Sequence, residues 1–129
     1  MTVHTPLRPT VVLVEDDAAL REAVQYALEI EGYPVVSCAS GEALLETALP
    51  DEPVCLVVDF HLGGMNGMET LETLRQRGRR YPTIVMTTAP SPRLRAWVRD
   101  TAATLIEKPL LDDVLIGAIR ALVEHMPPQ

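Results

Sequence analysis

Short apolar runs alternate along this chain with longer segments in which apolar residues recur every three or four positions. The runs VVLV at Val11–Val14 and VCLVV at Val54–Val58 contain no polar position. An unbroken apolar run of this length is typical of a strand buried on both faces of a parallel sheet. The pattern predicts strands over 10–15, 34–38, 54–58, 83–86 and 104–106.

The segments between these runs have the periodicity of amphipathic helices. Leu20, Val24, Ala27 and Leu28 lie on one helical face of the first such segment, and Gly32 stands where a helix ends. Helices are predicted over 18–31, between Ser40 and Pro50, and over 67–77, 93–101 and 112–125, with Asp17 and Ser40 as N-caps and Gly78 closing the third.

Five strand–helix pairs in alternation predict an α/β fold, a parallel sheet with helices on both faces. Parallel neighbours need crossover connections, and those connections are almost always right-handed. Neither an internal repeat nor a linker interrupts the pattern. We therefore expect one domain over residues 1–129, with a core of about 10–125, a short N-terminal arm (1–9) and a C-terminal tail (126–129).

Composition narrows the classes of partner that the protein can bind. Hydrophobic residues make up 47% of the 129 residues, enough for a sizeable core, and the net charge is −7. An acidic protein is a poor binder of nucleic acid or of an anionic membrane, so neither partner is expected. The chain contains neither a signal-peptide pattern nor an apolar stretch of membrane-spanning length, which predicts a cytoplasmic protein. Cys38 and Cys55 fall in strand-like runs and are expected to be buried thiols.

Polar residues gather where the predicted strands end. Glu15 and Asp16 follow the first strand and Asp59 follows the third. Ligands in open α/β sheets bind beyond the carboxyl ends of the strands, so these residues should line one acidic hollow. Crowded carboxylates repel, and a cation relieves that repulsion. Oxygen-only ligands suit Mg²⁺, or alternatively Mn²⁺. Acids at a helix N-terminus also favour the helix dipole, which accounts for Asp17 but not for its two neighbours.

Two more residues complete the set. Thr87 follows the fourth strand, and Lys108, with Pro109 after it, follows the fifth. A lone lysine is usually a solvated surface residue, but at a strand end facing carboxylates it could neutralise a phosphate oxygen. A threonine hydroxyl can rotate to donate to an oxyanion. The combination is more specific than any of its parts, because each residue follows a different strand.

With these residues in place, the sequence resembles the receiver domains of bacterial two-component response regulators. The resemblance runs from about Val11 to Val123, nearly the whole chain. It rests on the segments VLVEDD (12–17), DFHLGGMNG (59–67), PTIVMT (82–87) and KP (108–109). It implies a flavodoxin-like fold of strand order 2-1-3-4-5, and a cis peptide bond before Pro109.

The resemblance also implies a role for each site residue. Asp59 would accept a phosphoryl group from the phosphohistidine of a sensor histidine kinase or a histidine phosphotransfer protein. Asp16, Asp59 and the backbone carbonyl of His61 would bind Mg²⁺, and Glu15 would hold a metal-bound water. Thr87 and Lys108 would bind phosphoryl oxygens. The protein would catalyse only its own phosphorylation and dephosphorylation, and as a stand-alone regulator it would signal through its receiver surface.

Three positions depart from the family pattern. Leu105 stands where the family often has an aromatic switch residue, Gly63 replaces a common proline, and Thr88 replaces a smaller residue. The fourth helix, fifth strand and fifth helix, about residues 93–120, form the face through which the family commonly meets partners. Here that stretch carries Arg93, Arg95, Arg99 and Trp97, so dimerisation or kinase contact is expected through it.

Three other interpretations stay open at this point. A flavodoxin-like cofactor binder would need a phosphate-binding loop after the first strand, where Glu15, Asp16 and Asp17 would repel a phosphate. An aspartyl-phosphate phosphatase of the haloacid dehalogenase type would want a second aspartate at the position of His61. A degenerate receiver that acts only as a protein-interaction module is the third, and Leu105 keeps it in consideration.

Overall fold

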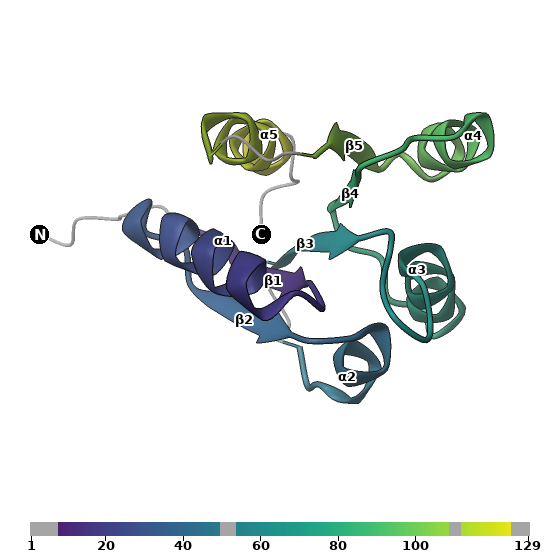
Figure 1. Ribbon diagram of the computed structural model, residues 1–129, viewed down its shortest axis with the longest axis horizontal. Coiled ribbons are helices and arrows are strands. Elements are labelled where there is room, and N and C mark those ends of the chain that lie inside the picture. The colour runs from purple at the N-terminus through teal and green to yellow at the C-terminus, as the bar shows by residue number, and fades with distance from the viewer. Residues whose placement is uncertain (1–7, 50–53, 109–111, 125–129) are drawn as a thin grey trace, which may run out of the picture.

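The computed structural model describes residues 8–49, 54–108 and 112–124. In these residues, five parallel strands form one sheet in the order β2-β1-β3-β4-β5. Their bounds are β1 Thr10–Val14, β2 Val35–Cys38, β3 Val54–Asp59, β4 Thr83–Thr87 and β5 Thr104–Glu107. The predicted α/β class and the flavodoxin-like strand order are both confirmed (Figure 1).

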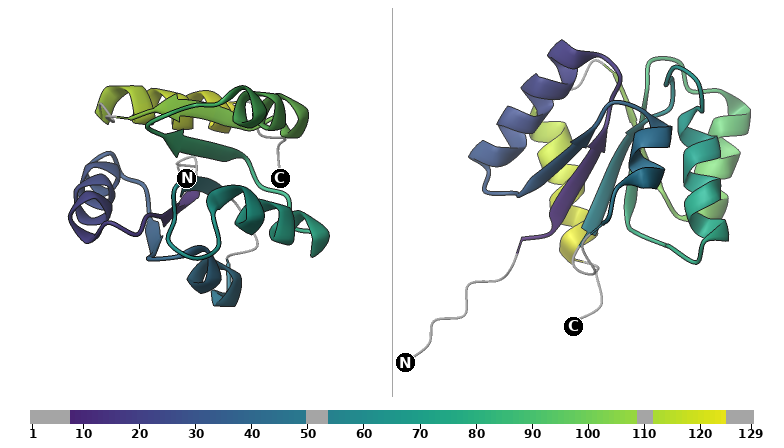
Figure 2. Two further views of the ribbon diagram at one scale, coloured as in Figure 1. Left: turned by 45° about the vertical axis from the view of Figure 1, so that its right-hand side comes forward. Right: turned by 90° about the horizontal axis from the view of Figure 1, so that it is seen from below.

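Helices cover both faces of this sheet (Figures 1 and 2). α1 (Ala18–Ile30) and α5 (Asp112–Glu124) lie on one face, whereas α2 (Gly41–Glu46), α3 (Gly67–Gln76) and α4 (Pro92–Thr101) lie on the other. Each face has its own cluster of buried apolar residues. Val11 and Leu13 belong to the α1–α5 cluster, and Val12 and Val14 to the other, because successive side chains point to opposite faces of a strand. The apolar run of β1 therefore supplies both cores.

In the described residues, the predicted helix boundaries agree with the structure to within one residue, except after Ser40. The side chains of Asp17 and Ser40 accept hydrogen bonds from Leu20 N and Ala43 N, as N-caps do. α2 is shorter than predicted and ends at Glu46. The reason is Thr47, whose backbone is extended (φ −86°, ψ 133°) while its hydroxyl donates to Ala43 O. Pro50 and Pro109, with its predicted cis bond, lie outside the described residues, as do 1–7 of the arm and all of the tail.

Gly67 lets the chain turn tightly from β3 into α3. A Cβ at this position would lie 2.7 Å from Asp59 O and 2.9 Å from Phe60 Cα, both of them backbone atoms. The N–H of Gly67 donates to Phe60 O at 3.1 Å, which closes the loop. Glycine is required here because backbone approaches backbone too closely for any side chain.

The cysteine and membrane predictions can also be compared with the structure. Both cysteines are described, and both are free, buried thiols as expected. Burial raises the pKa of Cys55 to about 12 and raises that of Cys38 as well. Within the described ranges, the helices are all too short or too polar to cross a membrane.

Candidate functional site

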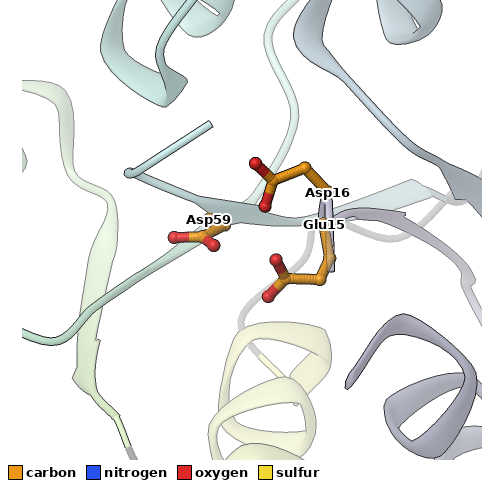
Figure 3. Close-up of side chains that lie close together, drawn as sticks. All are labelled: Glu15, Asp16 and Asp59. Atoms are coloured by element: carbon orange, nitrogen blue, oxygen red, sulfur yellow. The ribbon is translucent and has the colours of Figure 1, made fainter. Parts of the chain in front are cut away.

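Three carboxylates meet at the carboxyl edge of the sheet, as predicted. β1 and β3 are neighbours, with Val14 opposite Val58, so the residues that follow them in the chain lie side by side. Oxygen atoms of Glu15, Asp16 and Asp59 all lie within 4.8 Å of one another. Figure 3 shows these three side chains converging from the two strands.

The three carboxylates differ in their surroundings. Glu15 and Asp59 are only 1% and 3% exposed, whereas Asp16 is exposed to solvent. Oε2 of Glu15 accepts a hydrogen bond from the Asp17 N–H at 3.2 Å. Oδ2 of Asp16 accepts from the Gly63 N–H at 3.1 Å, which joins the β1–α1 loop to the β3–α3 loop. Asp16 is thus the carboxylate of the three that solvent ions reach most easily.

Lys108 lies between the two buried carboxylates. Its Nζ donates to Glu15 Oε1 and to Asp59 Oδ2, both at 2.9 Å. The Lys108 N–H donates to Thr87 O at 2.8 Å, so the backbone that positions the lysine is itself paired with β4. Because a single ammonium contacts both acids, it offsets the repulsion between them.

The pKa values of this cluster follow from burial and charge. Burial is the main cause that raises the pKa of Glu15; Lys108 opposes the rise and Asp59 adds to it. Burial by itself would lower the pKa of Lys108, but the hydrogen bonds and charges of Asp59 and Glu15 together raise it above its ordinary value. The lysine is therefore charged at neutral pH.

Thr87 is the last residue of β4, and it is fully buried. Its Oγ1 accepts the Ala89 N–H at 3.2 Å and lies 3.1 Å from His61 Nε2. The His61 N–H donates to Asp59 Oδ1 at 3.0 Å. His61 therefore contacts the predicted acceptor Asp59 through its backbone and Thr87 through its ring. The metal-ligand role of its carbonyl stays a prediction.

Sequence reasoning missed one residue that supports the site. Oε1 of Glu42, in the first turn of α2, accepts the Met65 N–H at 3.0 Å. This bond holds the β3–α3 loop beside Gly64, whose φ of +74° favours glycine. A glutamate in the first turn of a helix looks like an ordinary helix-dipole residue, so the sequence offered no signal for this contact.

The predicted position of Trp97 on the partner face is wrong. Its indole N–H donates to Glu72 Oε1 at 2.8 Å, and its ring packs against the apolar cluster beneath α3 and α4. An indole that is partly buried needs an acceptor for its N–H, and α3 provides one. Arg95, in contrast, does lie beside β5, where it pairs with Glu107 at 3.5 Å. Leu105 is half-buried against the same cluster.

The residues present fit the metal predicted here. Every donor in the described cluster is a carboxylate oxygen, and neither cysteine nor histidine nitrogen belongs to it. Mg²⁺ and Mn²⁺ prefer such hard oxygen ligands, often with water completing the coordination. Glu15 is less free than predicted, because one of its oxygens is paired with Lys108 and the other with a backbone N–H. Its predicted water-holding role stays a prediction.

Comparison with known proteins agrees with this geometry. Residues 11–120 match the family model described as the response regulator receiver domain. The transcriptional regulatory protein FixJ of Azorhizobium caulinodans is 35% identical over 110 residues, which cover 84% of this chain and 52% of FixJ. The response regulator MprA of Mycobacterium leprae is 32% identical over 119 residues, covering 92% and 52%. The chain thus spans about half the length of the curated relatives it matches.

Solved structures give the same result. The crystal structure of FixJ-N has a TM-score of 0.83 and 29% identity, covering 96% of this chain and all of that one. The response regulator StyR also has a TM-score of 0.83, with 27% identity, over 92% of this chain and 60% of StyR. The Vibrio cholerae chemotaxis protein CheY4, at 24% identity and a TM-score of 0.79, shares the fold over 90% of this chain and 99% of its own. The chain belongs to the family of response regulator receiver domains.

Proposed function

We propose that Asp59 accepts a phosphoryl group, and that the chain serves as the phosphorylated switch of a two-component pathway. The observation that carries this proposal is the double engagement of the Asp59 carboxylate. Oδ1 accepts the His61 N–H and Oδ2 accepts Lys108 Nζ, so the side chain is held in one orientation at the strand end. Asp16 and Glu15 lie beside it. A carboxylate held in this way is ready for in-line attack on a phosphorus atom.

The donor we propose is the phosphohistidine of a sensor histidine kinase or a histidine phosphotransfer protein. An oxygen of Asp59 supplies the electron pair for the new O–P bond, the N–P bond breaks, and its electron pair returns to the imidazole of the donor. Phosphoryl transfer needs positioning and charge stabilisation more than covalent assistance. Lys108 supplies a charge, and Thr87 a hydroxyl, for two of the phosphoryl oxygens.

Magnesium would be bound by Asp16, Asp59 and the His61 carbonyl, with manganese as an alternative. When bound, the ion neutralises charge that develops on the phosphoryl oxygens. The role of the chain is to hold the metal-binding oxygens in place. Gly63 and Asn66 contribute by shaping the loop, since Gly63 N–H binds Asp16 and Asn66 caps α3.

The signal ends when water attacks the phosphorus atom. The Asp59–phosphorus bond breaks, its electron pair restores the carboxylate, and inorganic phosphate leaves. The chain thus acts only on its own phosphoryl group, and its output is binding by the receiver surface. A homodimer through α4, β5 and α5 is part of this proposal, supported by the exposed Arg95 on that side.

Chemical phosphorylation tests the acceptor. After treatment with acetyl phosphate and Mg²⁺, mass spectrometry should find one added phosphoryl group in the wild type and none in Asp59→Asn. Asp100→Asn is the matched control, because it makes the same change on an exposed residue of α4. Its labelling should equal that of the wild type. Labelling of Asp59→Asn at the wild-type level would disprove the assignment.

Chelation and Asp16→Ala test the metal. Excess EDTA should abolish labelling, because no metal ion then neutralises the charge that develops on the phosphoryl oxygens. Asp16→Ala should weaken Mg²⁺ binding, measured by titration calorimetry, by about tenfold or more, since loss of even a hydrogen-bond partner of a metal ligand typically costs about 10–100-fold in affinity. Full labelling in EDTA would contradict the metal's role without affecting the choice of Asp59.

A further inference from the structure

The contact between His61 and Thr87 joins the acceptor loop to the end of β4. His61 Nε2 and Thr87 Oγ1 are 3.1 Å apart, although the residues are 26 positions apart in the chain. The Phe60 ring meets the imidazole edge-on, with centroids 5.0 Å apart and an interplanar angle of 85°. The His61 N–H is bound to Asp59 Oδ1. The imidazole is therefore restrained from both sides while the residue itself is exposed to solvent.

The donor in the hydrogen bond between Thr87 Oγ1 and His61 Nε2 follows from the number of hydrogens on each group. A threonine hydroxyl has one hydrogen to donate and two lone pairs to accept with. Thr87 Oγ1 already accepts the Ala89 N–H at 3.2 Å, and an N–H cannot accept in return. Within the described part of the chain, His61 Nε2 is the other partner of this hydroxyl. A buried hydroxyl hydrogen without an acceptor is costly, and Thr87 is fully buried. The bond therefore runs from Thr87 Oγ1–H to Nε2, and the ring hydrogen is on Nδ1.

We propose that His61 accepts the hydroxyl hydrogen of Thr87 in the unphosphorylated domain, and so competes with the phosphoryl group for the one hydrogen that Thr87 can donate. The inference rests on the proposed function, in which Thr87 donates to a phosphoryl oxygen. Phosphoryl oxygens only accept hydrogen bonds, so Thr87 must leave His61 before it can bind one. His61 is then a positioning residue that stabilises the unphosphorylated arrangement.

Nuclear magnetic resonance tests the direction of the bond without any phosphoryl group. Nitrogen-15 spectra of the 129-residue chain in mildly alkaline buffer should show His61 as the Nδ1–H tautomer, with Nε2 unprotonated. The Nε2–H form is the one usually preferred by free histidine, and a hydroxyl that donates to Nε2 reverses this preference. In Thr87→Val the signal should return toward the free-histidine pattern. A wild-type His61 in the Nε2–H form would overturn the inference.

Binding of beryllofluoride, a phosphoryl mimic, tests the competition. Its adduct with the Mg²⁺-loaded protein is measured by fluorine-19 spectra during titration. His61→Ala should bind beryllofluoride about fivefold tighter than the wild type, because one net hydrogen bond no longer has to be broken. His61→Gln keeps an acceptor oxygen on the side chain and should lie near the wild type. Mg²⁺ affinity is titrated for each variant, so that beryllofluoride affinities are compared at saturating metal.

A double-mutant cycle separates competition from a general effect of the substitution. In the Thr87→Val background, His61→Ala should leave beryllofluoride affinity unchanged, because there is no hydroxyl to release. Equal affinity of His61→Ala and wild type, or the same gain in the Thr87→Val background, would overturn the inference. A wild type that forms no adduct at all would instead overturn the proposed function, while the tautomer measurement would still decide on the His61–Thr87 bond.

Discussion

Replacing Lys108 with methionine removes the cation that lies between two buried carboxylates. Its Nζ is 2.9 Å from both Glu15 Oε1 and Asp59 Oδ2, and those side chains are 1% and 5% exposed. Breaking a buried ion pair usually costs about 3–5 kcal/mol, because an uncompensated charge remains. Here the cost cannot exceed the free energy of protonating one carboxylate, since a protonated carboxyl no longer carries a buried charge. At pH 7, protonating a glutamate of ordinary pKa 4.5 costs about 3.4 kcal/mol.

We therefore expect Lys108→Met to lower the free energy of unfolding by about 3 kcal/mol at pH 7. The loss should depend on pH in a known direction. Burial raises the pKa of Glu15 and Lys108 opposes that rise, so the pKa climbs further in the variant. A carboxyl whose pKa is higher in the folded protein than in the unfolded one destabilises the fold progressively as pH rises above the unfolded value. The loss should thus be smaller at about pH 5 than at pH 7.

Urea denaturation followed by circular dichroism, at both pH values and in EDTA, measures this loss. Arg95→Met is the control, because it removes a cation from an exposed pair, Arg95–Glu107 at 3.5 Å with side chains 56% and 60% exposed. That change should cost about 0.5 kcal/mol or less. The reasoning is refuted if Lys108→Met costs the same at pH 5 and pH 7, or costs no more than Arg95→Met.

Three further outcomes follow from the structure. Gly67→Ala should destabilise the fold by about 1–3 kcal/mol, because the added Cβ meets backbone atoms. Gly117→Ala in α5, where the added Cβ meets open space, should stabilise the fold by about 0.5–1 kcal/mol. Urea midpoints of the two variants that shift in the same direction would contradict this. A maleimide should label Cys38 and Cys55 only after unfolding, because both are buried and their pKa values are raised; rapid labelling of the native protein would show otherwise. Beryllofluoride should alter hydrogen exchange in residues 93–120, and changes confined to α1 and α2 would argue against signalling through that face.

Much of the site could be predicted from the sequence because it depends on strand ends. The apolar runs located β1 and β3, and parallel topology places their carboxyl ends at one edge of the sheet. Glu15, Asp16 and Asp59 therefore had to meet, and the structure places their oxygens within 4.8 Å. The same argument placed Thr87 and Lys108 at the ends of β4 and β5. Periodicity and strand order suffice for such statements, since neither depends on where a side chain points.

Only the tertiary structure decided which of these groups touch. Lys108 bridges residues 93 and 49 positions away, Glu42 reaches a backbone N–H 23 positions on, and Trp97 turns toward α3 instead of the face beside β5. Hydrogen bonds form over about 3 Å and in restricted directions, so they depend on rotamers and on the packing of neighbouring elements. A sequence pattern gives the face or the edge on which a residue lies. The contact between Thr87 and His61 depends on how the β3–α3 loop packs against the end of β4, and that is determined by the whole fold.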